Sequence, residues 1–187
     1  MEKPKLLLLG SSIMEQWHKP ETIFWDYTVV NRAVGGTTTT YWTHHVKEVL
    51  AEEHPDAVFA YVGSNDLVQP LPPKDIAKGV KRIRELISTY SEKLSFAYLA
   101  IIKAPQRLGR FHEIQATNHA IGEVLLPEDL WLESDPVFLN ANGEPKHHLY
   151  VEDGLHLNPE AYRLLTRYLA PEIVSWLDLC QKKCRNT

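Results

Sequence analysis

The fold class follows from Lys5-Leu-Leu-Leu-Leu-Gly10-Ser11-Ser12, near the start of this 187-residue chain. Four consecutive leucines are typical of a strand that is buried on both faces, as in a parallel sheet covered by helices. Gly10 permits a sharp turn at the end of the strand, and two hydroxyl groups follow it. Ligands of open α/β sheets bind outside the carboxyl ends of the strands. Ser11 and Ser12 are therefore expected where a ligand would bind.

The remaining pattern alternates between strands and helices. Short apolar runs predict further strands over residues 27–34, 57–62 and 94–102, and a weaker strand within 130–139, where Pro136 interrupts the run. Apolar residues at helical spacing predict helices over residues 13–17, 42–50, 74–90 and 114–125, and one from Pro159 onward. Asn158 is expected to cap this last helix, and Pro171 to kink or split it. We therefore expect one α/β domain over residues 1–187, a three-layer α/β/α sandwich with about five mainly parallel strands.

The composition limits the partners and the location of the protein. A net charge of −4 and a pI near 6.1 give no reason to expect binding to nucleic acid or to an anionic membrane. No stretch approaches the ~20 apolar residues of a transmembrane helix. The first apolar run is shorter than the ~7–15 residues of a signal-peptide core. We expect a cytoplasmic protein that is not inserted in a membrane.

Small polar clusters occur at predicted strand ends or loops. They are Gly10-Ser11-Ser12, Gly35-Gly36-Thr37, Gly63-Ser64-Asn65-Asp66 and Asp153-Gly-Leu-His156. Each cluster alone is an ordinary turn sequence. Taken together they contain a hydroxyl nucleophile, an imidazole, a carboxylate and several neutral hydrogen-bond donors.

These residue types are the ones that acyl transfer requires. A serine hydroxyl is a poor nucleophile, so it needs a base to accept its proton and a third group to orient that base. Asp153 and His156 are close enough in sequence for the carboxylate to accept the imidazole Nδ1–H, which leaves Nε2 to face a serine. Glycine backbone N–H groups and an asparagine amide can stabilise the oxyanion that develops.

The ordered blocks of the chain resemble those of the SGNH (GDSL-type) hydrolases. The blocks are Gly10-Ser-Ser12-Ile, Asn31-Arg-Ala-Val-Gly-Gly36-Thr, Gly63-Ser-Asn65-Asp66 and Val151-Glu-Asp153-Gly-Leu-His156-Leu-Asn158-Pro. The resemblance implies a flavodoxin-like fold and an esterase or acylhydrolase that cleaves esters or thioesters of small molecules without metal or cofactor.

The same resemblance assigns roles by position. It makes Ser12 the nucleophile, with Ser11 in place of the aspartate of the motif, and Asp153 and His156 the other members of the triad. The oxyanion hole would consist of the N–H of Ser12, the N–H of Gly36 and the side chain of Asn65. Gly36 is preferred to Gly35 because of its offset of five residues from Asn31.

Several alternatives stay open at this point. The site fits a short-chain or acetyl esterase, a thioesterase or lysophospholipase-type acylhydrolase, or a non-catalytic module that binds acylated sugars. The run of threonines at residues 37–40 could instead form a phosphate or flavin cradle. The pairs His44-His45 and His147-His148 are more typical of solvated side chains than of metal ligands. Trp17, Tyr41 and Trp42 fit either a substrate pocket or the core, and the sequence leaves a homo-oligomer open.

Overall fold

The computed structural model describes residues 3–18 and 26–185, with side chains as far as Cys180. Within these residues the sheet has five strands: β1 (Lys5–Gly10), β2 (Thr28–Asn31), β3 (Ala57–Tyr61), β4 (Ser95–Leu99) and β5 (Leu130–Leu132). All neighbouring pairs are parallel, and the strand order is β2-β1-β3-β4-β5. This is the order of the flavodoxin-like sheet, so the predicted fold class is confirmed.

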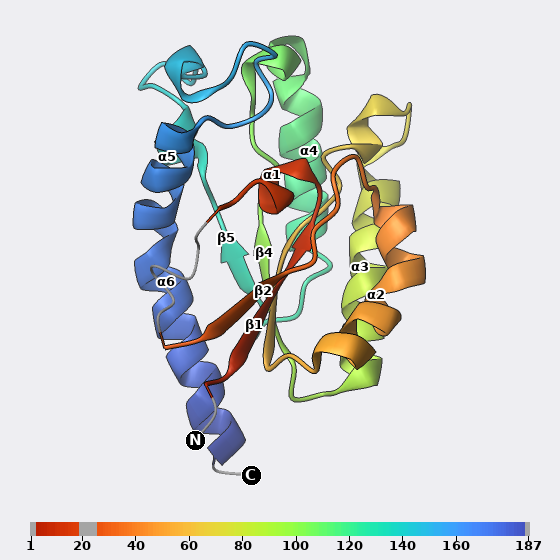
Figure 1. The fold of residues 1–187 in the computed structure, drawn as a ribbon. Helices are drawn as coiled ribbons and strands as arrows, with labels where there is room; N and C mark the ends of the chain where they lie inside the picture. The colour runs from red at the N-terminus through yellow and green to blue at the C-terminus, as the bar shows by residue number, and fades with distance from the viewer. Residues whose placement is uncertain (1–2, 19–25, 186–187) are drawn as a thin grey trace.

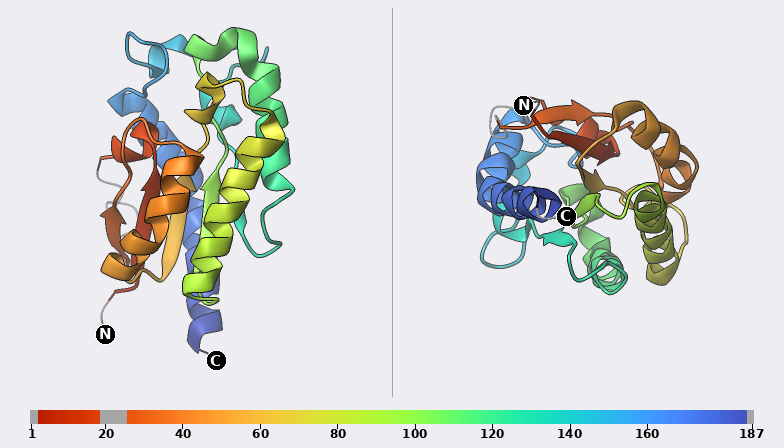
Figure 2. Two further views of the ribbon diagram at one scale, coloured as in Figure 1. Left: turned by 90° about the vertical axis from the view of Figure 1, so that its right-hand side faces the viewer. Right: turned by 90° about the horizontal axis from the view of Figure 1, so that it is seen from below.

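Helices cover both faces of the sheet (Figures 1 and 2). The α-helices are α1 (Ser12–Glu15), α2 (Thr39–Glu53), α3 (Pro73–Tyr90), α4 (Phe111–Gly122), α5 (Asp135–Phe138) and α6 (Pro159–Arg185), and the short 3₁₀ helices are η2 (Asp66–Val68), η3 (Pro105–Arg110) and η4 (His147–Leu149). Helices α2, α3 and α4 pack on one face, whereas α1, α5 and α6 pack on the other. None of the described helices is long and apolar enough to cross a bilayer.

The leucines of β1 divide the core into its two layers. Leu6 and Leu8 contact the layer that contains α6, and Leu7 and Leu9 contact the layer that contains α2 and α3. All four are at most 1% exposed. Successive side chains of a strand point to opposite faces, so four adjacent leucines hold both helical layers against the sheet, as the sequence predicts.

The structure refines the prediction for three segments. The weaker strand expected within residues 130–139 is β5, which ends at Leu132, and α5 follows, because proline fits the first turn of a helix and Pro136 occupies that turn. Strand β4 ends at Leu99, and the side chain of Asn118 then pairs with both the N–H and the carbonyl of Ile101, each at 2.9 Å. Pro171 lies inside α6 without splitting it, so of the two expected effects, a kink or a split, the split is wrong.

The end of β1 approaches β3 more closely than a side chain would allow. Gly10 has a φ of +147°, and a Cβ built on it would lie 2.2 Å from the carbonyl oxygen of Tyr61. The next N–H, that of Ser11, donates to this carbonyl at 3.1 Å. Only glycine permits this turn, which directs the chain from the sheet into α1.

We expect Gly10→Ala to lower the free energy of unfolding by at least about 3 kcal/mol, since it adds both a backbone clash and an unfavourable φ. Urea unfolding monitored by circular dichroism measures this change. Gly122→Ala is the matched control, because no atom lies within 4 Å of a Cβ at Gly122, at the end of α4. The control is expected to keep or slightly raise stability. Equal stabilities of the two variants would contradict the proposed constraint.

Candidate active site

Ser12 is the first residue of α1, directly beyond the carboxyl end of β1. Ser11 precedes it as the N-cap residue and is only 2% exposed, whereas Ser12 is half-buried. The side-chain amide of Asn31 donates to the carbonyl of Met14 at 2.8 Å and so ties α1 to the end of β2. Of the two adjacent hydroxyl groups, the structure presents that of Ser12 at the edge of the sheet.

The structure brings Asp153 and His156 to Ser12 from the far end of the chain. Nε2 of His156 lies 2.9 Å from Oγ of Ser12, and Nδ1 lies 2.5 Å from Oδ2 of Asp153. These contacts correspond to an imidazole that donates its Nδ1 proton to the carboxylate and accepts the serine proton at Nε2. The three side chains that the sequence singled out therefore form one continuous hydrogen-bonded row.

Asp153 orients both the ring and the backbone of His156. Its Oδ1 accepts the N–H groups of Leu155 and His156 at 2.8 and 2.9 Å, while its Oδ2 holds the imidazole. These hydrogen bonds, that of the imidazole first, lower the pKa of Asp153 to about 2. The carboxylate is therefore ionised throughout the neutral range.

The loop that carries these two residues is anchored at both ends. The N–H of Val151 donates to the carbonyl of His156 at 2.9 Å, and the N–H of Gln106, in η3, donates to the carbonyl of Gly154 at 3.0 Å. The side chain of Asn158 accepts the N–H of Ala161 at 3.0 Å, which confirms the predicted cap of α6. His156 thus sits between a closed turn and the start of a long helix.

Gly36 and Asn65 lie in two different loops, which are linked by hydrogen bonds of Thr37. Oγ1 of Thr37 donates to the carbonyls of Gly10 and Val34, at 3.1 and 2.8 Å. Nδ2 of Asn65 donates to the carbonyl of Thr37 at 2.9 Å, which occupies one of the two hydrogens of the amide. Gly36 is exposed and has a φ of +75°, and its N–H makes no hydrogen bond within the described part of the chain. The Gly36 and Asn65 loops are therefore linked to the turn that leads to Ser12.

Sequence reasoning missed the residue that fixes the start of α2. Asp66 is only 2% exposed, and its carboxylate accepts both the N–H and the hydroxyl of Thr39. A carboxylate at a helix N-terminus is favourable. Its position directly after Asn65 was visible in the sequence, but the partner, 27 residues earlier, was not.

The hydroxyl groups of the threonine run are mostly occupied within the protein. Thr37 and Thr39 make the contacts described above, and the hydroxyl of Thr38 accepts the N–H of Tyr41 at the start of α2. The hydroxyl protons of Thr37 and Thr39 are therefore used within the protein, which disfavours a phosphate cradle at this run.

The aromatic and histidine candidates divide between core and surface. Trp17 and Trp42 are 2% and 1% exposed and belong to the core, and Tyr41 stacks on the ring of His45. His44, His147 and His148 are exposed. Within residues 3–18 and 26–180, no group of three His, Cys, Asp or Glu side chains is placed to hold a metal ion.

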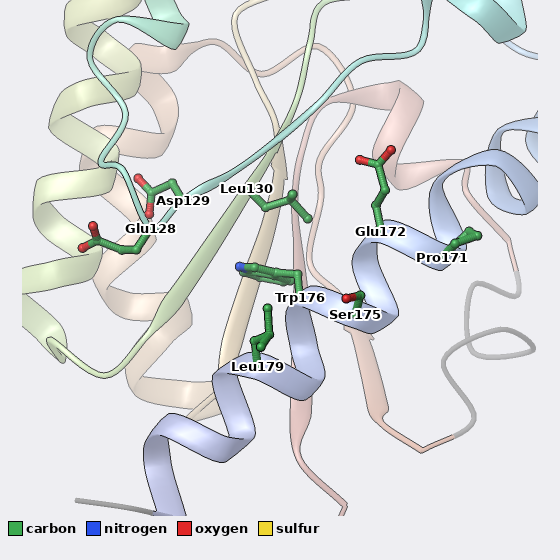
Figure 3. Close-up of a pocket in the computed structure, with 8 residues that line it drawn as sticks. All are labelled: Glu128, Asp129, Leu130, Pro171, Glu172, Ser175, Trp176 and Leu179. Atoms are coloured by element: carbon green, nitrogen blue, oxygen red, sulfur yellow. The ribbon is translucent and has the colours of Figure 1, made fainter.

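A separate pocket lies at the opposite edge of the sheet (Figure 3). Glu128 and Leu130 line it from the amino end of β5, and Trp176 and Leu179 line it from α6. It contains none of the residues that the sequence singled out for chemistry.

Comparisons with known proteins found similarity over most of the chain. A family model described as the GDSL-like lipase/acylhydrolase family matches residues 8–164. An arylesterase of Vibrio mimicus is 26% identical over 191 residues, covering 92% of this chain and 90% of that protein.

Solved structures share the fold at lower sequence identity. A psychrotrophic esterase from Pseudoalteromonas sp., inhibited by monoethylphosphonate, has a TM-score of 0.74 at 18% identity, over 93% of this chain and 98% of that one. A GDSL-like lipase from Bacteroides thetaiotaomicron has a TM-score of 0.73 at 17% identity, over 94% and 92% of the two chains.

The lowered pKa of Asp153 predicts a pH-dependent contribution to stability. A carboxylate with a depressed pKa stabilises the fold above its unfolded pKa of about 4, and this contribution is lost as the pH falls toward about 2. We expect the Tm difference between the wild type and Asp153→Asn to be largest above about pH 4 and to shrink toward about pH 2.

Thermal unfolding across this pH range is the measurement. Glu152→Gln is the control, because Glu152 is an exposed neighbour that makes no hydrogen bond within the described residues. Its Tm difference from the wild type is expected to show no comparable change. A constant difference for Asp153→Asn would contradict the role of its ionised form.

Proposed function

The chain belongs to the GDSL-like lipase/acylhydrolase family, and on that premise we propose that it hydrolyses short-chain acyl or acetyl esters of small molecules through an acyl-enzyme at Ser12. The family makes the protein a carboxylic ester hydrolase. The observation that carries the finer proposal is the row Ser12–His156–Asp153, with contacts of 2.9 and 2.5 Å. A module that only binds acylated sugars would need no such row. We also retain the cytoplasmic location as a prediction from the sequence.

In the first step Oγ of Ser12 attacks the acyl carbonyl carbon while Nε2 of His156 accepts the serine proton. The imidazolium that forms is stabilised by Asp153, which stays ionised and holds the ring through Nδ1. His156 then gives its proton to the leaving alcohol as the bond between the carbonyl carbon and the alcohol oxygen breaks. A water molecule repeats the sequence on the acyl-enzyme and releases the carboxylic acid and the free serine.

Negative charge on the tetrahedral intermediate requires donors that are already in place. We assign this role to the N–H of Ser12, the N–H of Gly36 and the second hydrogen of the Asn65 amide. The N–H of Ser12 belongs to the first turn of α1, where a helix leaves its N–H groups without internal partners. The contacts of Thr37 support this assignment, since they link the Gly36 and Asn65 loops to the Ser12 turn.

Exposed apolar side chains at the carboxyl edge of the sheet support an ester with an apolar acyl or alcohol part. Val34 and Val151 are exposed on loops, Val68 is exposed in η2, and Leu108 is exposed in η3. The names of the relatives, an arylesterase and an esterase, agree with small ester substrates.

Ser12→Ala is expected to lower kcat on a short p-nitrophenyl ester by about 10⁴-fold or more, because the acyl-enzyme cannot form. A fluorophosphonate probe should label the wild type and not this variant, and circular dichroism should show an intact fold. Ser11→Ala is the matched control, because Ser11 is buried. This variant is expected to retain labelling and most of the activity. Loss of labelling in Ser11→Ala alone would transfer the nucleophile to Ser11.

Asn65→Ala is expected to lower kcat by about 10²–10³-fold, the usual cost of one lost oxyanion donor, with a smaller change in KM. Steady-state kinetics on the same ester measure both constants. Thr38→Ala, the control, removes a polar side chain from the adjoining loop between β2 and α2 and is expected to leave kcat within a few-fold of wild type. An unchanged kcat in Asn65→Ala would remove this amide from the oxyanion hole.

A further inference from the structure

A buried arginine lies at the same edge of the sheet as the proposed triad. Arg107 belongs to η3, which follows β4. The preceding residue, Gln106, donates its N–H to the carbonyl of Gly154 at 3.0 Å. A Cβ on Gly154 would come within 3.4 Å of Pro105, so the two segments are in contact. Arg107 therefore directly follows a residue that is hydrogen-bonded to the loop that carries Asp153 and His156.

The charge of Arg107 is close enough to the end of β3 to interact electrostatically with Tyr61, the last residue of that strand, four positions before Asn65. Arg107 is 7% exposed, and its Nη1 is buried without a hydrogen-bond partner. The side chain is thus buried within electrostatic range of Tyr61, and its backbone adjoins the loop that carries His156.

The charge of Arg107 has no counter-charge among the described residues. Arg84 pairs with Asp129 at 2.9 Å, and Arg110 pairs with Glu113, but Arg107 makes no ion pair there. The titratable groups that act on it are Tyr61 and Arg110, with no carboxylate among them. Burial lowers the pKa of Arg107 and raises the pKa of Tyr61, so the phenol stays neutral and supplies no negative charge. Arginine nevertheless remains protonated in proteins.

An unpaired buried cation is costly, and such violations are typical of functional sites, where a ligand supplies the missing group. The planar guanidinium fits a carboxylate or a phosphate, because both present two acceptor oxygens to its fork of N–H groups. We propose that Arg107 binds a negatively charged group of the ester substrate, a carboxylate or a phosphate, and thereby makes the enzyme prefer anionic esters to neutral esters of similar size. This inference rests on the proposed esterase function.

The position of Arg107 also bears on neutral substrates. A long apolar acyl chain lying against the guanidinium would bury its charge more deeply and still provide no partner. Anionic substrates are therefore favoured in two ways. They form an ion pair with Arg107, and apolar chains that would cover the guanidinium bind less well.

Two matched pairs of esters test the proposal. Monoethyl succinate against ethyl butyrate places a carboxylate on the acyl group, and glycerol monoacetate 3-phosphate against glycerol monoacetate places a phosphate on the alcohol. Acid release in a pH-stat gives kcat/KM for each ester. We expect the anionic member of at least one pair to be preferred by about 10- to 100-fold, as for a charge-assisted pair. The pair that shows the preference identifies the source of the anion.

Arg107→Met should abolish this preference by bringing kcat/KM of the anionic ester down to that of its neutral partner. Arg110→Met is the matched control, since Arg110 is more exposed and paired with Glu113, and it should retain the preference. If kcat/KM of the wild type for the anionic ester did not exceed that for the neutral ester in either pair, this result alone would overturn the proposal. A ratio that persists in a folded Arg107→Met protein would overturn it as well.

A binding measurement separates this proposal from the esterase proposal. If the wild type cleaved none of the four esters, the proposed function would fail, but anion binding would still be measurable. Succinate or glycerol 3-phosphate should then raise the Tm of the wild type and of Arg110→Met, and not that of Arg107→Met. No shift with either anion would overturn the role of Arg107.

Discussion

The close contact between the backbones of Gly10 and Tyr61 is the constraint on which the site depends. It turns the chain out of β1 so that Ser11 bonds to β3 and Ser12 begins α1. The carbonyl of Gly10 also accepts the N–H of Val34 and the hydroxyl of Thr37, from the loop after β2. One glycine thereby sets the relative positions of three segments. The turn of the proposed nucleophile and the loop of Gly36 are consequently held together by hydrogen bonds to the backbone of Gly10.

A single carboxylate organises the fourth segment in the same manner. Asp153 binds the imidazole of His156 and two backbone N–H groups, so the ring and its turn are oriented together. The same turn is bonded to η3 through Gly154 and Gln106. A backbone hydrogen bond therefore joins the segment that carries Arg107 to the segment that carries His156. Recognition of an anion and proton transfer would occur on two segments that are hydrogen-bonded to each other.

Much of this arrangement could be predicted from local sequence. The leucines of β1 and the spacing of Ile76, Val80 and Ile83 in α3 determine their own structure, and the residue types of the four clusters suggested the chemistry. The contact of Asp66 with Thr39 and the burial of Arg107 were not predictable, because they depend on how distant segments pack. The weaker strand within residues 130–139 was predictable, but its end at Leu132 and the helix after it were not, because Pro136 is compatible with a strand edge as well as with a helix start. The roles of Gly36 and Asn65 stay predictions, although the structure links their loops to the Ser12 turn.

The contact between Ser12 and His156 spans 144 residues of sequence. During synthesis the serine therefore leaves the ribosome roughly 7 to 30 s before the histidine, at ordinary rates of about 5–20 residues per second. Throughout that interval the nascent chain carries the proposed nucleophile without its base. Any ribosome-bound fragment shorter than this span is expected to be inert toward the esters around it, so catalytic competence would arise late in translation.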